Sequence, residues 1–185
     1  MPRIFLETPR LILRVWQPGD SEPYIALNAD PQVMEFFPSL LSREETLAQI
    51  SRITMAIAEN GYGFFAIERK DNHQFIGFAG LNYVTFASDF TPCTEIGWRL
   101  SRGNWGYGFA TEAASACLEF GFDKLNLDRI YAFTALNNVR SENVMKKIGM
   151  QKIGTFDHPL VPVDSHVKEH LLYKINRDLK YVKGC

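Results

Sequence analysis

The spacing of hydrophobic residues divides the chain into helical and extended segments. Apolar residues recur every three or four positions at 42–60 and again at 109–122, which predicts two amphipathic helices. Shorter patterns of the same kind predict helices at 21–28 and 141–148. Alternating or continuous apolar runs, bounded by turn residues, predict strands at 10–16, 64–69, 74–86, 94–101, 129–136, 150–156 and 167–175.

The order of these elements predicts the fold class. One strand, two helices and three strands are followed by alternating helices and strands. This order is typical of a mixed α/β sheet of six to seven strands, mostly antiparallel, with helices on both faces. We expect one domain over residues 8–176 and a charged C-terminal tail at 177–185. Gly77 and Gly80 lie inside one predicted strand and indicate a bulge or a closely packed neighbouring backbone.

Charge and composition narrow the function classes. The chain has 20 basic and 21 acidic side chains, for a net charge of -1, which argues against nucleic acid as the main partner. No run approaches the roughly 18 apolar residues of a membrane span, and no signal peptide is recognisable, so we expect a cytoplasmic protein without a membrane partner. Three cysteines give no disulfide framework. His166 and His170 lie on a predicted strand without a third ligand, so we expect no metal site.

A glycine-rich turn between a strand and a helix predicts an anion site. An apolar strand ends near Leu100, Gly103, Gly106 and Gly108 follow, and a helix begins at about Phe109. The first-turn amides of a helix have no internal partner and lie at the positive end of its dipole. Glycine also lets the backbone approach a bound phosphate closely. The stretch therefore indicates a phosphate-bearing ligand.

Three phosphate ligands compete for this turn. A P-loop requires Lys-Ser or Lys-Thr after its last glycine, where this chain has Phe109 and Ala110. A dinucleotide fingerprint requires a third small residue where Thr111 stands, within an early strand–helix–strand unit that is missing here. The third ligand is the pyrophosphate of coenzyme A. A turn without any ligand is the structural alternative.

Five motifs carry a resemblance to a known family. They are T-P-R-L-I-L-R from Thr8, F-I-G-F-A-G-L from Phe75, E-I-G-W-R-L-S from Glu95, W-G-Y-G-F-A-T-E from Trp105 and N-x-x-S-x-x-V-x-x-K-x-G-M from Asn138. In this order they resemble the signatures of the GNAT N-acetyltransferases, and most closely the RimJ/RimL-type branch, which acetylates the N-termini of ribosomal proteins. The resemblance covers nearly the whole chain. It implies the GNAT fold and transfer of an acetyl group from acetyl-CoA to a primary amine.

The resemblance also implies a coenzyme site. The backbone of Trp98, Arg99 and Leu100 would pair with the pantetheine arm, and Lys147 would reach the nucleotide end. Asn138 and Ser141 would contact the arm near the thioester. The amides that would wrap the pyrophosphate belong to the stretch Arg102, Gly103, Trp105, Gly106, Tyr107, Gly108, Phe109 and Ala110.

Two positions depart from the family pattern. Many relatives have Gln or Arg where Gly103 stands, and Arg102 would compensate as a charged phosphate donor. Many relatives have a tyrosine acid where this chain has Met145. A phenolic acid at that position is therefore excluded, which keeps open a catalytically silent acyl-CoA-binding module.

The chemistry requires a base for the amine and a donor for the leaving group. Glu95 is the candidate base, with a solvated strand glutamate as its structural alternative. Ser141 is the candidate acid or thiolate stabiliser, and its structural alternative is an N-cap of the following helix. We expect direct attack in a ternary complex.

The acceptor is the least readable part of the sequence. An α-amine has a pKa near ~8 and a lysine near ~10.4, so a protein N-terminus demands less of the base and is favoured. A polyamine, an amino acid and an antibiotic amine stay open. Phe36, Phe37, Phe86 and Phe90 are candidates to line the acceptor pocket. The oligomeric state, monomer or homodimer, is also open.

Overall fold

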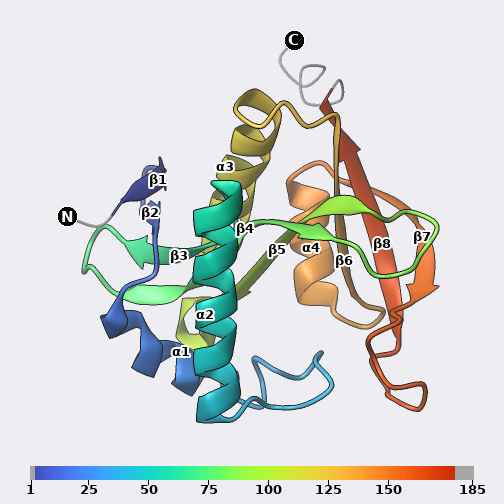
Figure 1. The fold of residues 1–185 in the computed structure, drawn as a ribbon, viewed down its shortest axis with the longest axis horizontal. Coiled ribbons are helices and arrows are strands. Elements are labelled where there is room, and N and C mark those ends of the chain that lie inside the picture. Colours follow the sequence, from blue (N-terminus) through green and yellow to red (C-terminus); the bar gives the residue numbers. More distant parts are fainter. Residues whose placement is uncertain (1–2, 178–185) are drawn as a thin grey trace.

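The computed structural model describes residues 3–177. These residues form an eight-stranded sheet in the order β1-β2-β3-β4-β5-β6-β8-β7, of which β5–β6 is the parallel pair (Figure 1). The strands are β1 (Ile4–Glu7), β2 (Leu11–Arg14), β3 (Phe64–Arg69), β4 (Phe75–Val84), β5 (Cys93–Leu100), β6 (Arg129–Ala135), β7 (Gln151–Asp157) and β8 (Glu169–Asn176). The helices are η1 (Pro18–Asp20), α1 (Ser21–Asn28), α2 (Arg43–Asn60), η2 (Arg102–Asn104), α3 (Phe109–Asp123) and α4 (Val139–Lys147).

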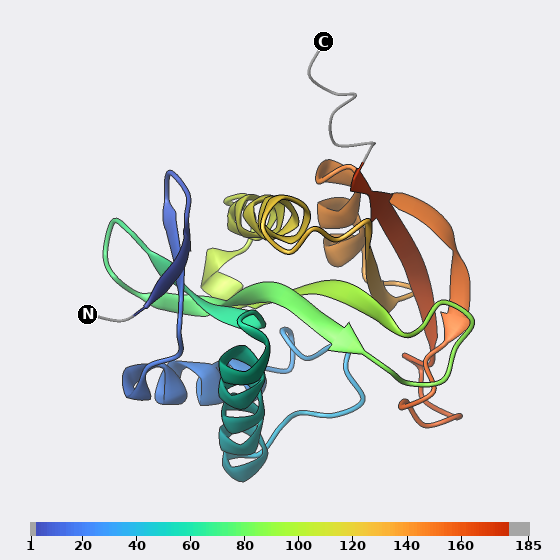
Figure 2. The ribbon, with the colours of Figure 1, turned by 45° about the horizontal axis from the view of Figure 1, so that its top comes forward.

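Helices cover both faces of the sheet. Helices α1 and α2 lie on one side, and α3 and α4 lie on the other (Figure 2). The main core lies between these layers and includes Leu13, Phe65, Ile96, Leu118 and Ile130. The mixed, mostly antiparallel α/β sheet expected from the sequence is confirmed.

The strand count expected from the sequence is wrong. Strand β1 is an eighth strand, which the sequence pattern did not show because it has only four residues and none of them is fully buried. It pairs with β2 at the edge of the sheet. From residue 178 onward, the predicted tail lies outside the described residues.

Local sequence signals explain most element boundaries. Helix α2 begins after Ser42, whose side chain accepts a hydrogen bond from the Glu45 amide while Glu45 accepts from the Ser42 amide. The helix ends at Gly61, whose φ of 76° is left-handed. Helix α4 begins earlier than expected, because Asn138 caps it: Asn138 Oδ1 accepts a hydrogen bond from the Ser141 amide at 3.1 Å. The alternative of Ser141 as the N-cap is therefore wrong.

The two glycines in β4 permit close approaches of neighbouring backbone. A Cβ atom at Gly80 would lie 1.9 Å from the Gly63 carbonyl oxygen, and one at Gly77 would lie 2.1 Å from the Arg99 carbonyl oxygen. Since Cβ atoms do not occur at such distances, both positions require glycine. The expectation of a closely packed neighbouring backbone is confirmed.

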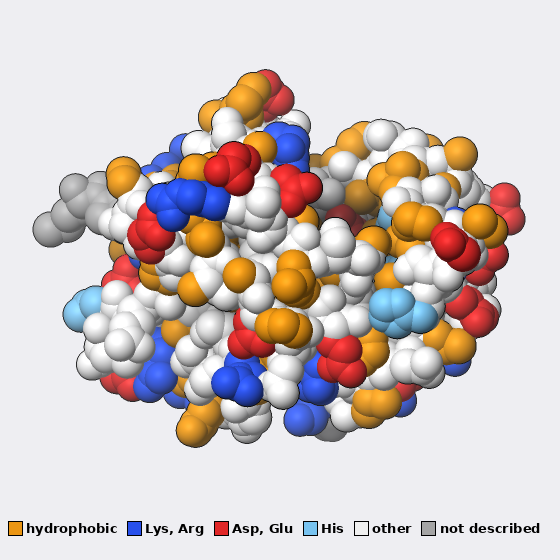
Figure 3. All heavy atoms as spheres, turned by 90° about the horizontal axis from the view of Figure 1, so that it is seen from below, with side chains coloured by type: hydrophobic (Ala, Val, Ile, Leu, Met, Phe, Trp, Pro, Cys, Tyr) orange, Lys and Arg blue, Asp and Glu red, His pale blue; other side chains and the backbone are white. Residues whose placement is uncertain are grey.

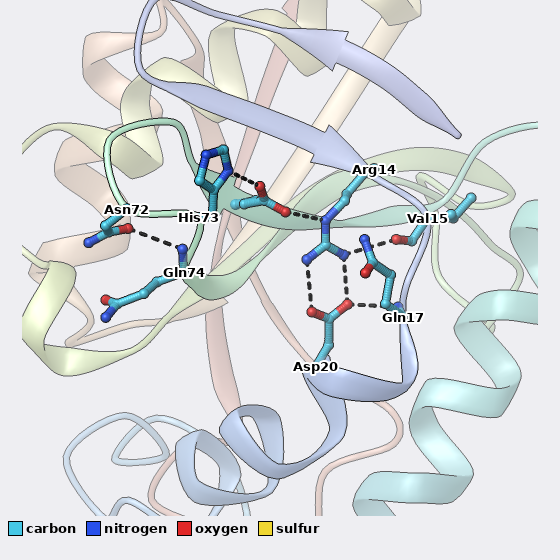
Figure 4. Close-up of polar contacts among 8 residues, drawn as sticks. Arg14, Val15, Gln17, Asp20, Asn72, His73 and Gln74 are labelled. Atoms are coloured by element: carbon cyan, nitrogen blue, oxygen red, sulfur yellow. Dashed lines mark hydrogen bonds and ion pairs between the residues drawn. The ribbon is translucent and has the colours of Figure 1, made fainter. Parts of the chain in front are cut away.

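A buried ion-pair cluster holds β2, η1 and β3 together (Figure 4). Arg14 Nη1 and Nη2 bind the Asp20 carboxylate at 2.7 and 2.9 Å, and Arg14 Nε binds Glu68 Oε2 at 2.7 Å. His73 Nδ1 lies 2.9 Å from the other Glu68 oxygen. This cluster fixes the entry into α1 against the sheet.

Strands β5 and β6 separate soon after they meet. Their pairing consists of one bridge, Glu95 with Tyr131, whereas β4 pairs with β5 along eight residues from Gly77 to Val84. From Ile96 to Leu100, β5 therefore has a neighbouring strand on one side only. This separation positions the candidate site in the middle of the sheet.

No helix among residues 3–177 combines the length and the apolar character needed to cross a bilayer. On the face seen from below, Lys and Arg side chains are interspersed with Asp, Glu and hydrophobic side chains (Figure 3).

Candidate active site

A cavity of about 760 Å³ lies where β5 and β6 separate. Its walls come from β5, β6, the N-terminal ends of α3 and α4, and the segments before α2 and after β7. Most residues that the sequence implied for coenzyme binding line it, namely Trp98, Arg99, Leu100, Trp105, Gly106, Gly108, Phe109, Ala110, Asn138, Ser141 and Lys147. The structure therefore brings together residues from three separate motifs.

The start of α3 has the geometry of an anion site. Gly106 and Gly108 have left-handed φ values of 80° and 81°, and Gly108 is the N-cap, without a side-chain cap. A Cβ atom at Gly103 or Gly106 would meet nothing within 4 Å. Gly108, Phe109 and Ala110 at the start of α3 line the cavity together with Lys147. These donors fit a pyrophosphate.

Arg102, Gly103 and Tyr107 do not line the cavity. The Arg102 guanidinium is turned toward the segment before α2, where Nη1 donates to Gln32 Oε1 at 2.8 Å and Nε lies 3.8 Å from Asp30. Tyr107 is 63% exposed. Their contacts with a coenzyme stay predictions.

Arg140, at the start of α4, contacts residues around the predicted coenzyme site, and the sequence did not suggest these contacts. Its guanidinium lies 4.5 Å from the centre of the Trp105 ring and forms a 2.6 Å ion pair with Glu35. Trp105 is in turn fixed by a hydrogen bond from Nε1 to the Leu100 carbonyl. Arg140 therefore links α4 to the turn before α3 and to the segment before α2.

Glu95 lies at the point where β5 and β6 separate, and it lines the cavity. Its Oε1 accepts a hydrogen bond of 2.9 Å from Asn82 Nδ2. Burial raises the pKa of the Glu95 carboxyl to about 7, because the hydrogen bond from Asn82 offsets only part of the desolvation. A carboxyl with this pKa is suited to general-base catalysis near neutral pH.

Ser141 lies in the first turn of α4 and lines the cavity, as does Asn138. Asn138 Nδ2 donates to Thr134 Oγ1 at 2.9 Å, so the start of α4 is fixed to β6. Met145, one turn further along, is 2% exposed. The structure therefore leaves the Ser141 hydroxyl as the candidate donor on this helix.

Strand β5 presents two different faces to the cavity. Arg99 bonds to Asn28 of α1, so Glu95, Gly97 and Arg99 lie on the side of α1 and α2. Ile96, Trp98 and Leu100 alternate with them and point to the side of α3. The coenzyme contacts and the base therefore approach the cavity from opposite faces of the sheet.

Aromatic residues line the part of the cavity on the α1 and α2 side. Phe36 and Phe37 line it as predicted, together with Phe64 and Phe78. Phe86 and Phe90 do not line it. They pack with Phe133 and Phe156, with ring centres 4.8–6.3 Å apart, because the loop after β4 folds back onto β6 and β7.

Two histidines also line the cavity, and His170 lies on the same face of the sheet as Glu95. His158 and His170 have ring centres 4.9 Å apart and line the cavity with Phe133. Burial, aided by His170 and Lys168, lowers the pKa of His158 to about 4, so this imidazole is neutral at physiological pH. Among residues 3–177, no group of three or more His, Cys, Asp or Glu side chains is placed to hold a metal ion.

Cys117 belongs to the core rather than the site. Its side chain is fully buried in α3, and burial raises the pKa of its thiol.

Sequence and structure comparisons agree on the family. The sequence model of the protein family described as the acetyltransferase (GNAT) domain matches residues 10–151. The uncharacterized N-acetyltransferase YnaD of Bacillus subtilis (strain 168) is 33% identical over 153 residues, which cover 82% of this chain and 85% of that protein.

Solved structures support the same assignment. The acetyltransferase (GNAT family) from Bacillus anthracis matches with a TM-score of 0.79 at 26% identity, covering 95% of this chain and 99% of that chain. Mycobacterium smegmatis RimJ in complex with CoA-disulfide shares the fold, with a TM-score of 0.73 at 22% identity, covering 91% of this chain and 82% of that chain. The chain belongs to the GNAT acetyltransferases and is an acetyl-CoA-dependent N-acetyltransferase.

Proposed function

We propose that the acceptor is an α-amine, which attacks directly in a ternary complex while Glu95 serves as the general base. The observation that carries the proposal is the position of Glu95. It lines the cavity at the separation of β5 and β6, and its pKa is raised to about 7. A carboxylate with that pKa accepts a proton from an amine more readily than an ordinary glutamate does.

The residues present fit the coenzyme. The β5 backbone from Trp98 to Leu100 would hold the pantetheine arm, the amides at the start of α3 would hold the pyrophosphate, and Lys147 would reach the nucleotide. When bound, acetyl-CoA supplies an acetyl thioester, so that an N–C bond forms as a C–S bond breaks.

Two side chains assist the reaction in this scheme, one by accepting a proton and one by donating a hydrogen bond. The Glu95 carboxylate takes the proton that the amine must lose, directly or through a water molecule. The Ser141 hydroxyl is the hydrogen-bond donor to the leaving sulfur. Ser141 suits this role because Asn138, and not Ser141, caps α4.

The α-amine of a protein N-terminus is the acceptor that the RimJ/RimL-type motifs favour. The α-amine of a free amino acid has the same reacting group. Both are less basic than a lysine side chain, so a larger fraction is unprotonated at neutral pH.

Release of free thiol, measured with a panel of amines, tests the role of Glu95. We expect Glu95→Gln to lower kcat roughly 100-fold while coenzyme affinity stays unchanged. Wild-type kcat/KM, corrected for the unprotonated fraction of the amine, should rise with pH and level off above about 7. Glu59→Gln, which changes an exposed glutamate of α2, is the matched control.

Two outcomes would contradict the proposal. Unchanged activity of Glu95→Gln excludes Glu95 as the base. Coenzyme binding without turnover on any amine supports the alternative of a catalytically silent acyl-CoA-binding module.

A further inference from the structure

Arg99 is a buried cation that lacks a charged partner. Its side chain is 9% exposed and lines the cavity. Nη1 donates to Asn28 Oδ1 at 2.7 Å, whereas Nε is buried and has no hydrogen-bond partner. Among residues 3–177, Arg99 forms no ion pair with a carboxylate. Burying an unpaired charge is costly, so this guanidinium is arranged to receive an anion.

The partners of Arg99 hold it in place without neutralising it. Asn28 is fully buried, and its Nδ2 group lies 3.2 Å from Thr46 Oγ1 and 3.4 Å from Gln49 Oε1. Those contacts turn the Asn28 carbonyl oxygen toward Arg99. The Phe37 ring lies 4.0 Å from the Arg99 guanidinium carbon and covers it. The side chain is therefore fixed in orientation while its positive charge persists.

The coenzyme phosphates are not the anion that Arg99 receives. Its side chain lies on the side of α1 and α2, whereas the anion site at the start of α3 lies on the other side of the sheet (Figure 2). The acceptor is the ligand that approaches from the side of Glu95. Glu95 and Arg99 are four residues apart on the same face of β5 and line the same cavity. Their Cα atoms are about 13 Å apart along the strand, so a small acceptor held by Arg99 reaches the Glu95 carboxylate through water.

The residues around Arg99 also indicate the chemical character of the rest of the acceptor. Phe64 and Phe78 pack against each other with ring centres 4.9 Å apart, and the guanidinium lies 5.6 Å from the Phe78 ring. An apolar group fits these walls. The low local dielectric strengthens an ion pair with Arg99 and disfavours a polyamine, whose second cation would be repelled.

We propose that the acceptor is a free amino acid with an apolar side chain, that Arg99 binds its carboxylate, and that its amine loses a proton to Glu95 through water. This inference rests on the proposed function and narrows its acceptor. A protein N-terminus has an amide carbonyl in place of that carboxylate, so it lacks the group that Arg99 is arranged to bind.

The test compares acceptors that differ only in the carboxylate. We would measure acetylation of the apolar L-amino acids, of their C-terminal amides and of the decarboxylated amines, with each rate corrected for the unprotonated fraction. For the best amino acid, we expect kcat/KM to exceed that of its amide by about 10- to 100-fold, mainly through KM. Calorimetry of the same pair with coenzyme A-saturated protein should show the same ratio of dissociation constants.

Substitution then assigns the preference to Arg99. Arg99→Gln should remove most of the preference for the acid, measured within the variant as the ratio of kcat/KM for the acid to kcat/KM for its amide. Arg43→Gln removes an exposed arginine of α2 and should leave the preference intact. Retained coenzyme binding by Arg99→Gln shows that the fold is preserved.

Equal use of acid and amide by the wild-type protein, or a preference for amides, peptides or polyamines, would overturn the inference while leaving the acetyltransferase function in place. The wild-type comparison decides this even if Arg99→Gln does not fold. Failure of the proposed function looks different: the coenzyme binds and no amine is acetylated, yet calorimetry still reports whether acid binds more tightly than amide.

Discussion

Arg14 and Arg99 are both buried, but their partners differ in kind. Arg14 is 4% exposed and binds two carboxylates, those of Asp20 and Glu68. Burial alone would lower its pKa, yet the hydrogen bonds and charges of the two acids outweigh burial and raise it. Arg99 is 9% exposed and has one amide partner, and burial lowers its pKa. The first arginine completes a structural cluster, and the second retains capacity for a ligand.

Glu95 extends this contrast to an acid. Like Arg99, it lines the cavity and is held by one asparagine instead of an opposite charge. Arg14 in the structural cluster is thus paired with carboxylates, whereas Arg99 and Glu95 at the site are each paired with an asparagine amide. A neutral amide orients a charged group without neutralising it, which leaves the charge available to a substrate.

Removing Arg14 is expected to have the largest effect on stability. Arg14→Met leaves Asp20 buried without its cation, so the free energy of unfolding should fall by about 3–5 kcal/mol. Urea denaturation measures it. Arg43→Met, which breaks an exposed ion pair with Glu22, is the control and should change stability little. If Arg14→Met unfolds at the same urea concentration as the wild-type protein, the structural role of the cluster is contradicted.

Glu95 should destabilise the fold above neutral pH. The pKa of Glu95 is raised in the folded protein to about 7 from 4.5. The folded protein therefore has its full stability below pH 4.5, where the carboxyl is protonated in both states, and loses stability as the pH rises to about 7. At pH 8, Glu95→Gln should therefore be more stable than wild type by about 1–3 kcal/mol. The difference should vanish near pH 4.5 in thermal or urea unfolding. A pH-independent difference would show that the carboxyl is not buried.

Converting Asn28 to Asp should make Arg99 resemble Arg14. A carboxylate in contact with Nη1 would neutralise the guanidinium, so Asn28→Asp should reduce the preference for free amino acids over their amides roughly tenfold. Thiol release with the matched acceptors measures the preference. Asn60→Asp, at the exposed end of α2, should leave it unchanged. An undiminished preference would mean that the carboxylate of the acceptor binds elsewhere.

The smallest effect is expected for the stability of Arg99→Met. Because the substitution removes a buried charge that has no carboxylate partner, the free energy of unfolding should change by less than about 1 kcal/mol. Urea denaturation beside Arg14→Met gives the direct contrast. A loss as large as that of Arg14→Met would show that Arg99 is a structural residue.

The sequence predicted those parts of the molecule that depend on local signals. The Ser42 and Glu45 capping box, the glycines at the start of α3 and the position of Glu95 on β5 follow from short-range patterns, and the family motifs added the coenzyme. Strand β1 was not predicted, because four residues are too few to show a strand pattern. The contact of Arg99 with Asn28 was not predicted, because the residues are 71 positions apart and no local sequence pattern relates them.

The acceptor side was the least predictable for the same reason. Phe64 and Phe78 read as strand residues, and only the fold turns them toward the cavity. Phe86 and Phe90 were assigned to the acceptor pocket by their loop position, but they pack with Phe133 and Phe156 because their loop folds back over the sheet.

The separation of β5 and β6 has a consequence for the stability of the whole chain. Each strand presents an unpaired backbone edge in the interior of the sheet, where most proteins keep such edges at the margins or cover them. An extended ligand that bonds to the β5 edge acts as a missing strand, and its binding energy adds to the folding free energy. The free energy of unfolding of this protein should thus rise with the concentration of the coenzyme.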